Sequence, residues 1–312
     1  MKAEVTRNAI DLEDFTPEAM QEVIRGATLE HFVLGNDLCR FRGRQWTTGT
    51  FSVNTGSYSF ATRILGCFPQ DRITIGYMRR MSSTSWMNGF DVRTDHLQFY
   101  PEGTEVNYRS ARNGEWVGIE MEREFLESTV LEHLGRELGL PRRGAWNVTV
   151  PLPLLGELDR LVMASLRPEA DPRAMILPIT RMIADLLASQ NADSLRGSML
   201  RWKKRSAELW AAESYLRSNL ADGFNSDAFA AAMGRSERSL QLLFKEAYGF
   251  SPQHWARCLA LHMARKYLQR INPRLYTIQA VAEECGFNHM GRFAHHYKAL
   301  FGESPSMTLA KV

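Results

Sequence analysis

The spacing of hydrophobic residues divides the chain into a first part typical of strands and a second part typical of helices. Strand-forming runs bounded by Gly, Asn, Ser and Thr occur at residues 49–65, 72–78, 96–100, 104–110 and 115–121. From residue 151 onward, hydrophobic residues instead recur every three or four positions, as on one face of a helix. The pattern predicts a β-rich domain over residues 1–150.

Two amphipathic helices are predicted over residues 151–188. Their hydrophobic stripes are Leu155, Leu158, Val162 and Leu166, and then, after Pro178, Ile179, Met182, Ile183, Leu186 and Leu187. Such stripes either pack against the β-rich domain or form a dimer interface, and the sequence leaves both interpretations open. Residues 189–206 are polar and weakly patterned, which predicts a linker, and residues 207–312 are almost wholly helical by pattern.

The helical part contains an internal repeat. The segment LQLLFKEAYGFSP (240–252) aligns with FAHHYKALFGESP (293–305) at a constant offset of 53 residues. The alignment places Phe244 over Tyr297 and Gly249 over Gly302. Two copies of one supersecondary unit explain this agreement.

Each copy has the parts of a helix-turn-helix. In the first unit, residues 226–248, Ser226 and Ser236 are expected to cap two helices joined by the turn MGRS. In the second unit, residues 277–301, Thr277 opens the first helix and CGFN makes the turn before a helix from about His289. A predicted helix over residues 254–271 joins the units. Its length of about 27 Å separates the two second helices by nearly one DNA turn, which is about 34 Å long.

The outward face of each second helix follows from a rotation of about 100° per residue. The outward and flanking positions are Arg238, Gln241, Leu242 and Lys245 in the first unit, and Gly291, Arg292, His295 and Lys298 in the second. This face carries cations and hydrogen-bonding groups, whereas His296 points closer to the packed side. We therefore expect the two second helices to present a polar, basic surface.

The charge distribution supports a polyanion contact in the same part of the chain. The whole chain has a net charge of +3, but from Arg201 onward 16 Lys and Arg stand against 9 Asp and Glu. The balance there is +7, against −4 for the first 200 residues. A basic module behind an acidic body suggests nucleic acid as the partner, although a solvated basic face also fits the charge alone.

Metal binding and catalysis find little support in the sequence. His295 and His296 diverge as neighbours on a helix, no HxxxH or HExxH spacing occurs, and no carboxylate or nucleophile is spaced to orient either ring. The cysteines Cys39, Cys67, Cys258 and Cys285 form no CxxC and are expected to be reduced thiols. We expect no cofactor and no enzymatic activity.

These residues together resemble the AraC/XylS family of bacterial transcription regulators over about residues 206–310. The paired helix-turn-helices and the pattern A-x-x-C-G-F-x-x-x-x-x-F-x-x-x-Y-K-x-x-F-G-x-x-P, from Ala282 to Pro305, carry the resemblance. The run from Gly286 to Leu309 is most similar to the branch of toluate-type and ethanolamine-type regulators. By layout alone, the β-rich part and its two helices resemble that branch's effector and dimerisation domain.

The resemblance implies an α+β chain with a cupin-like β-rich domain, a helical dimerisation segment and a double helix-turn-helix domain. It also implies roles for individual residues in binding double-stranded DNA. Base contacts fall on Arg238, Gln241, Leu242, Gly291, Arg292 and His295, and phosphate contacts on Ser236, Lys245 and Lys298. Many relatives carry Arg where Leu242 stands. Leucine cannot bind guanine bidentately, so the first unit either touches a thymine methyl group there or relies on Arg238 and Gln241.

The implied function is a sequence-specific DNA-binding transcription regulator that acts as a small-molecule-responsive activator, with RNA polymerase and a second copy of the chain as further expected partners. For the effector pocket we select Trp86, Arg44 and Trp46, while the RFRGR run at residues 40–44 is interpreted as an exposed loop. Two alternatives are a ligand-independent architectural DNA binder and a cupin-type metalloenzyme. The second is disfavoured because His31, His96 and His133 are well separated in the β-rich part.

The sequence also predicts where the protein resides. No stretch approaches the roughly 18 unbroken apolar residues of a membrane helix, and the first residues lack the apolar core of a secretion signal. We therefore expect a cytoplasmic protein without a membrane partner.

Overall fold

The computed structural model describes residues 5–12, 24, 26–35, 39–88, 90–189, 207–272 and 276–311. The chain forms two compact units. The β-rich unit comprises Met1–His31 and Leu38–Lys204, and the helical unit comprises Phe32–Asp37 and Arg205–Val312. The predicted α+β class, with a β-rich region before a helical C-terminal domain, is confirmed. Apart from Ser189, the predicted linker at 189–206 lies outside the described residues.

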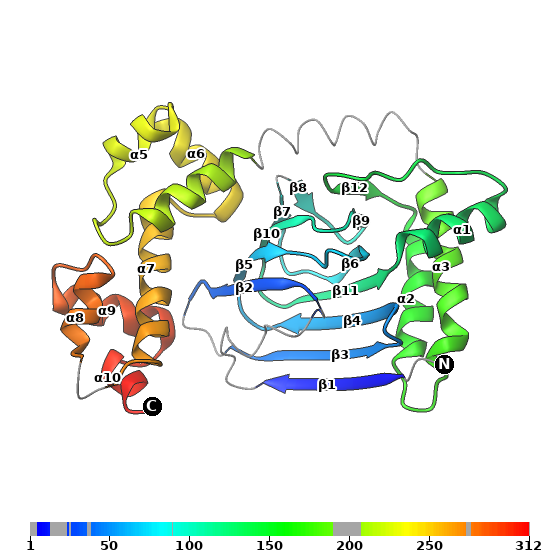
Figure 1. Cartoon of the computed structure of the whole chain (residues 1–312), viewed down its shortest axis with the longest axis horizontal. Coiled ribbons are helices and arrows are strands. Elements are labelled where there is room, and N and C mark those ends of the chain that lie inside the picture. The colour runs from blue at the N-terminus through cyan, green and yellow to red at the C-terminus, as the bar shows by residue number, and fades with distance from the viewer. Residues whose placement is uncertain are drawn as a thin grey trace. The chain divides into compact units, whose positions relative to one another are not determined.

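Two antiparallel sheets form the β-rich unit (Figure 1). The larger sheet has the order β1 (Thr6–Leu12), β3 (Phe41–Thr47), β4 (Phe51–Tyr58), β11 (Gly114–Met121), β6 (Ile73–Arg80), β9 (His96–Tyr100) and β12 (Trp146–Thr149). The smaller sheet has the order β2 (Thr28–Val33), β5 (Thr62–Cys67), β10 (Glu105–Ser110), β7 (Ser85–Met87) and β8 (Phe90–Val92). Most neighbouring strands are distant in sequence; for example, β11 lies between β4 and β6.

Three helices cover one face of the larger sheet: α1 (Arg123–Leu134), α2 (Leu152–Ser165) and α3 (Pro172–Ala188) (Figure 1). Because side chains alternate along a strand, Ile119 of β11 points to this face, where it joins one buried core with Leu158 of α2 and Ile183 of α3. The predicted hydrophobic stripes therefore pack against the sheet, which was one of the two interpretations left open.

One local expectation about the β-rich unit is wrong. The run at residues 40–44 is no loop, because Phe41–Thr47 forms β3, paired on both sides by β1 and β4, with Arg42 and Arg44 exposed on it. Helix α3 begins before Pro178, since the Asp171 side chain accepts a hydrogen bond from the Arg173 N–H at 3.0 Å and Pro172 occupies the first turn. A hydrophobic pattern reveals neither the partner strands of β3 nor the cap of α3.

The described residues of the helical unit include a helical segment at 207–218 and six further helices. These are α5 (Ser226–Met233), α6 (Glu237–Tyr248), α7 (Pro252–Leu268), α8 (Ile278–Glu284), α9 (Met290–Phe301) and α10 (Pro305–Leu309). Among the described residues, every helix is too short or too polar to cross a lipid bilayer.

Candidate nucleic-acid interface

The first helix-turn-helix consists of α5 and α6. The cap of α5 differs from the expectation: Asn225, not Ser226, is the cap, because its side-chain oxygen accepts a hydrogen bond from the Ala228 N–H at 2.9 Å. Gly234 then ends α5 with φ 60°, a left-handed conformation that glycine adopts without steric cost. Ser236 caps α6 as expected, accepting from the Ser239 N–H at 3.3 Å.

Packing fixes which face of α6 is free. Leu240, Phe244 and Ala247 are buried, and the Phe244 ring meets Phe229 of α5 edge to face with centroids 5.9 Å apart. The opposite face is exposed and consists of Arg238, Gln241, Leu242 and Lys245. Leu242 is 52% exposed, which is unusual for a large apolar side chain and leaves it available for contact with a partner.

The second helix-turn-helix repeats this construction with α8 and α9. Thr277 caps α8 through the Ala280 N–H at 3.1 Å. On α9, Phe293, Tyr297 and Leu300 are buried, and the Tyr297 hydroxyl donates to Thr308 Oγ1 of α10 at 2.8 Å. The exposed positions are Gly291, Arg292, His295 and Lys298.

Helix α7 joins the two units and carries its own polar anchor. The Trp255 indole N–H donates to Glu213 Oε2 at 2.7 Å, and both side chains are buried. The helix runs from Pro252 to Leu268 and ends three residues before the predicted residue 271. Ser251 caps its start by accepting from the His254 N–H at 3.2 Å, with Pro252 at the first helical position. Its 17 residues span about 25 Å, so the geometric argument for successive major grooves is unchanged.

The three C-terminal histidines occupy different environments. His289 and His295 are exposed, while His296 is half-buried. Burial, and then the neighbouring Arg257, hold the pKa of His296 below its ordinary value. In the described part of the chain no group of three or more His, Cys, Asp or Glu side chains is placed to hold a metal ion.

Of the three residues selected for an effector pocket, Arg44 and Trp46 border one hollow, and Trp86 lies apart from them in the smaller sheet. Trp46 is buried in the core beneath the helices, where its indole N–H donates to Ser165 Oγ at 2.8 Å. Arg44 is exposed, and with Trp46 it borders an open hollow beside β1 and the end of α2. Trp86 is buried on β7, opposite Arg109 of β10.

Sequence reasoning missed a cavity between the two sheets. It has a volume of about 90 Å³ and is lined from both sheets, and none of the three selected residues borders it. Its polar lining includes His31, Thr74 and Gln98, each almost fully buried. The only sequence signal was the run of polar residues at alternate positions inside hydrophobic strands, such as Gln98 between Leu97 and Phe99.

Comparisons with known proteins agree on the C-terminal part of the chain. A family model described as a helix-turn-helix domain matches residues 229–311. A probable thc operon regulatory protein of Rhodococcus erythropolis is 36% identical over 101 residues, which is 32% of this chain and 30% of that protein. XylDLEGF operon transcriptional activator 1 of Pseudomonas putida is 28% identical over 145 residues, or 46% of this chain and 44% of that protein. The chain thus spans less than half the length of these curated relatives.

One solved structure, a probable AraC family transcriptional regulator from Rhodopseudomonas palustris, is 32% identical, with 34% of this chain and 97% of that chain covered and a TM-score of 0.32. Paired helix-turn-helices with exposed basic second helices define a DNA-binding protein, and the helix-turn-helix domain binds DNA. Over residues 229–311 the chain has the helix-turn-helix domain of the AraC/XylS family of transcription regulators.

Proposed function

We propose that the chain is a small-molecule-responsive transcription activator that reads DNA through α6 and α9. The observation that carries this proposal is the pair of exposed polar faces on two helices that occupy equivalent places in a repeat. Two of the relatives are named as transcriptional activators. A bound activator has RNA polymerase as its functional partner.

Base reading in this proposal falls on the exposed residues of both second helices. Arg238 and Arg292 reach guanine, Gln241 and His295 form hydrogen bonds to base edges, Leu242 contacts a thymine methyl group, and Gly291 lets the backbone approach. Ser236, Lys245 and Lys298 contact phosphates, which positions the domain without reading sequence. Their exposure supports these roles, since none of these side chains is taken up by the core.

The cavity between the sheets is the place we propose for the effector. Within the described residues, Gln98 Nε2 and Thr74 Oγ1 are buried without a hydrogen-bond partner, although Gln98 Oε1 accepts from the Tyr100 hydroxyl at 3.1 Å. Buried polar atoms ordinarily have partners, so these two suit a ligand with a hydrogen-bonding group.

The charge of the lining narrows the class of ligand. No Lys, Arg, Asp or Glu is among the described residues that line the cavity, and burial lowers the pKa of His31 to about 3, which keeps it neutral. A carboxylate ligand would therefore lack a cation to pair with. We infer an uncharged, mainly apolar effector with a hydrogen-bond acceptor. The cavity is smaller than the roughly 150 Å³ that accepts benzene, so larger ligands require the lining to shift.

A homodimer is the assembly we propose. Leu152 at the start of α2 is 61% exposed and Leu177 of α3 is 39% exposed. Large apolar side chains on the outer surface of these two helices suit contact with a second copy, while the buried stripes remain in the core.

The DNA part is tested by comparing specific with random duplexes. Arg238→Ala and Arg292→Ala should each cost about 1–3 kcal/mol on the operator and relax preference at one base pair. Lys298→Ala should weaken binding to all duplexes alike. The measurement is a fluorescence anisotropy titration at fixed salt. Equal losses on random DNA for all three variants would contradict the assigned roles.

A further inference from the structure

A cleft of about 560 Å³ lies inside the helical unit, between the two helix-turn-helices. Three segments distant in sequence line it. Asn225 and Ala228 come from the N-terminal end of α5, Gln253 and Arg257 from α7, and Arg292 and His296 from α9. We call it the central cleft. Of the residues to which the family resemblance assigns DNA contacts, Arg292 alone lines this cleft.

The central cleft carries positive charge that the protein itself does not neutralise. Arg257 is half-buried on its wall, and its Nη2 lies 3.2 Å from His254 Nδ1, so the guanidinium donates to a neutral ring and not to a carboxylate. Asp222 is the one carboxylate among the described residues that line the cleft. No ion pair joins Asp222 to Arg257 or Arg292 within the described part of the chain. The lining therefore has spare cationic donors.

The position of the central cleft indicates which ligand its cationic side chains bind. In a helix-turn-helix complex the first helix crosses the DNA backbone while the second lies in the major groove. The central cleft is bordered by the start of one first helix, α5, and by the recognition face of the other unit, where Arg292 lies on α9. With α6 and α9 in successive major grooves, the minor groove and its two flanking phosphodiester backbones lie between them, on the side where α7 joins the two units.

We propose that the central cleft binds the phosphodiester backbone between the two grooves, with Arg257 as the main phosphate ligand and His254 and His296 beside it. This adds a third contact to the two recognition helices and fixes their common register on DNA. A phosphate contact here carries no base information, so it acts equally on any sequence.

The two histidines make this contact dependent on pH. Burial first, then Arg257 and then His296 lower the pKa of His254; burial first, then Arg257, His295 and Arg292 lower that of His296. Asp222 is the opposing charge on the lining. Both rings are therefore neutral at neutral pH in the free protein. A phosphate near Arg257 offsets the repulsion and raises both pKa values, so DNA binding takes up protons and strengthens as the pH falls.

The first test measures the salt dependence of binding by the full chain to a random duplex of about three helical turns. Arg257→Gln should lower affinity roughly 3- to 10-fold and reduce the slope of log affinity against log salt by about 1. Lys266→Gln is the matched control, because Lys266 is an exposed cation on α7, nine residues on and about 180° around the helix. Arg257→Lys should retain the slope. An unchanged slope in Arg257→Gln would overturn the proposal.

The second test measures affinity at about pH 8 and about pH 6, on either side of the ordinary histidine pKa. The wild-type chain should bind about threefold or more tightly at the lower pH, and the double variant His254→Gln/His296→Gln should lose this gain. His295→Gln controls for the exposed histidine on the same helix and should retain it. A gain that survives in the double variant but disappears in His295→Gln places the protons outside the cleft and overturns the role of the histidine pair.

Discussion

Glu120 is an ionisable side chain in an environment that opposes its charge. It lies on β11 and is fully buried, where its Oε1 accepts a hydrogen bond from Asn54 Nδ2 at 2.8 Å. Burial raises the pKa of its carboxyl group to about 8, against the smaller opposing effects of Asn54 and Arg72. Since this carboxyl group holds its proton more tightly in the folded chain than in the unfolded chain, folding becomes less favourable as the pH rises from about 4.5 to about 8.

Glu120→Gln should remove this pH dependence. Glutamine keeps an acceptor for Asn54 but has no charge to bury. We expect the variant to be more stable than the wild type by on the order of a few kcal/mol at about pH 8.5, with the difference disappearing at about pH 4.5. Urea unfolding followed across this range measures the effect. Glu124→Gln, at an exposed site on α1, serves as control; an identical profile for Glu120→Gln and the wild type would contradict the prediction.

The sequence predicted the exposure of single residues well on α6 and α9 and poorly in the β-rich unit. Every predicted contact residue on α6 and α9 is exposed, because a helix repeats its facing within a single turn. Whether those residues contact DNA as assigned stays a prediction. Trp86, Arg44 and Trp46 were selected by residue type alone, and residue type does not indicate which face of which sheet a side chain occupies.

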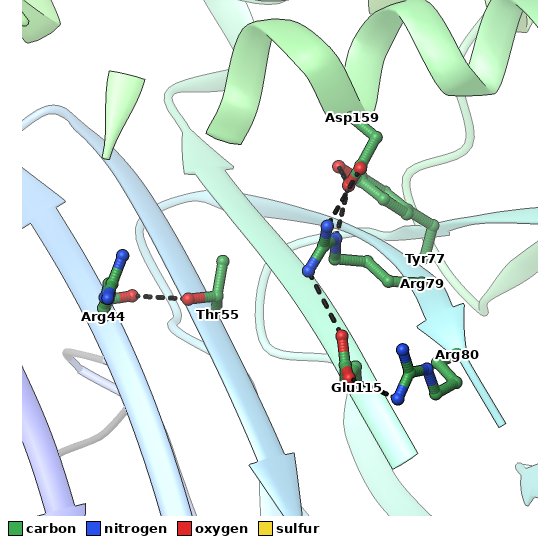
Figure 2. A network of polar contacts seen from close by, with 7 residues as sticks. All are labelled: Arg44, Thr55, Tyr77, Arg79, Arg80, Glu115 and Asp159. Carbon is green, nitrogen blue, oxygen red and sulfur yellow. Dashed lines mark hydrogen bonds and ion pairs between the residues drawn. The ribbon is translucent and has the colours of Figure 1, made fainter. Parts of the chain in front are cut away.

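At the scale of elements, α2 is fastened to the larger sheet by a polar network (Figure 2). Asp159 of α2 accepts from Arg79 Nε at 2.7 Å, from Arg79 Nη2 at 3.2 Å and from the Tyr77 hydroxyl at 3.1 Å. Arg79 also bridges to Glu115 of β11 at 3.2 Å, and Glu115 pairs with Arg80 at 3.5 Å. Asp159 raises the pKa of Arg79, and burial together with Asp159 raises that of Tyr77. Three elements thus share one network.

Asp159→Ala should loosen α2. The substitution leaves Arg79 and Tyr77 without their shared acceptor, and we expect the free energy of unfolding to fall by about 2 kcal/mol. Glu157→Ala on the same helix is the control, since its partner Arg160 is 72% exposed and such pairs contribute about 1 kcal/mol or less. Chemical denaturation of both variants measures the contrast. Equal losses would mean that the network does not hold the helix.

The helices and strands differ in whether the nearby sequence alone determines them. Hydrophobic periodicity predicted helices at α2, α6, α7 and α9 because it is written within a few turns of chain. It did not predict β1, β3 or β12, or helix α1. Strand β3 has the largely polar sequence FRGRQWT. It forms a strand because β1 and β4 supply hydrogen-bond partners for its backbone groups.

For the whole molecule, the proposed activity requires that the cavity in the β-rich unit influence DNA binding by the helical unit. A ligand that binds the folded β-rich unit stabilises it by mass action, and it can change DNA affinity only if it binds the DNA-competent state differently from the other states. The two units and the two kinds of site are therefore testable together with one ligand.

Screening by thermal shift should find stabilisation by small uncharged aromatic or alkyl molecules with a hydrogen-bond acceptor, and none by the matching carboxylates. Gly118→Val should abolish the shift, because Gly118 lines the cavity and a Cβ there meets neighbours only at 3.7 Å or beyond, so the side chain fills the cavity without a clash at its first atom. Arg44→Ala, in the separate hollow, should leave the shift intact.

Two other outcomes would contradict the proposed effector site or the proposed response to a ligand. Stabilisation by carboxylates that requires Arg44 would move the effector site to the hollow beside β1. Sequence-specific DNA binding with no ligand response across the panel would favour the ligand-independent architectural binder.

The sequence by itself determined the paired helix-turn-helices, their exposed faces and the family, because these follow from short-range periodicity, caps and a repeat at a fixed offset. Only the tertiary structure decided where the cavity and the central cleft lie. Gln98 and Thr74 line one cavity from neighbouring strands, and Arg257 and His296 line one cleft from different helices, through packing between segments far apart in the chain. Such contacts depend on the register and packing of whole elements, which a one-dimensional pattern does not specify.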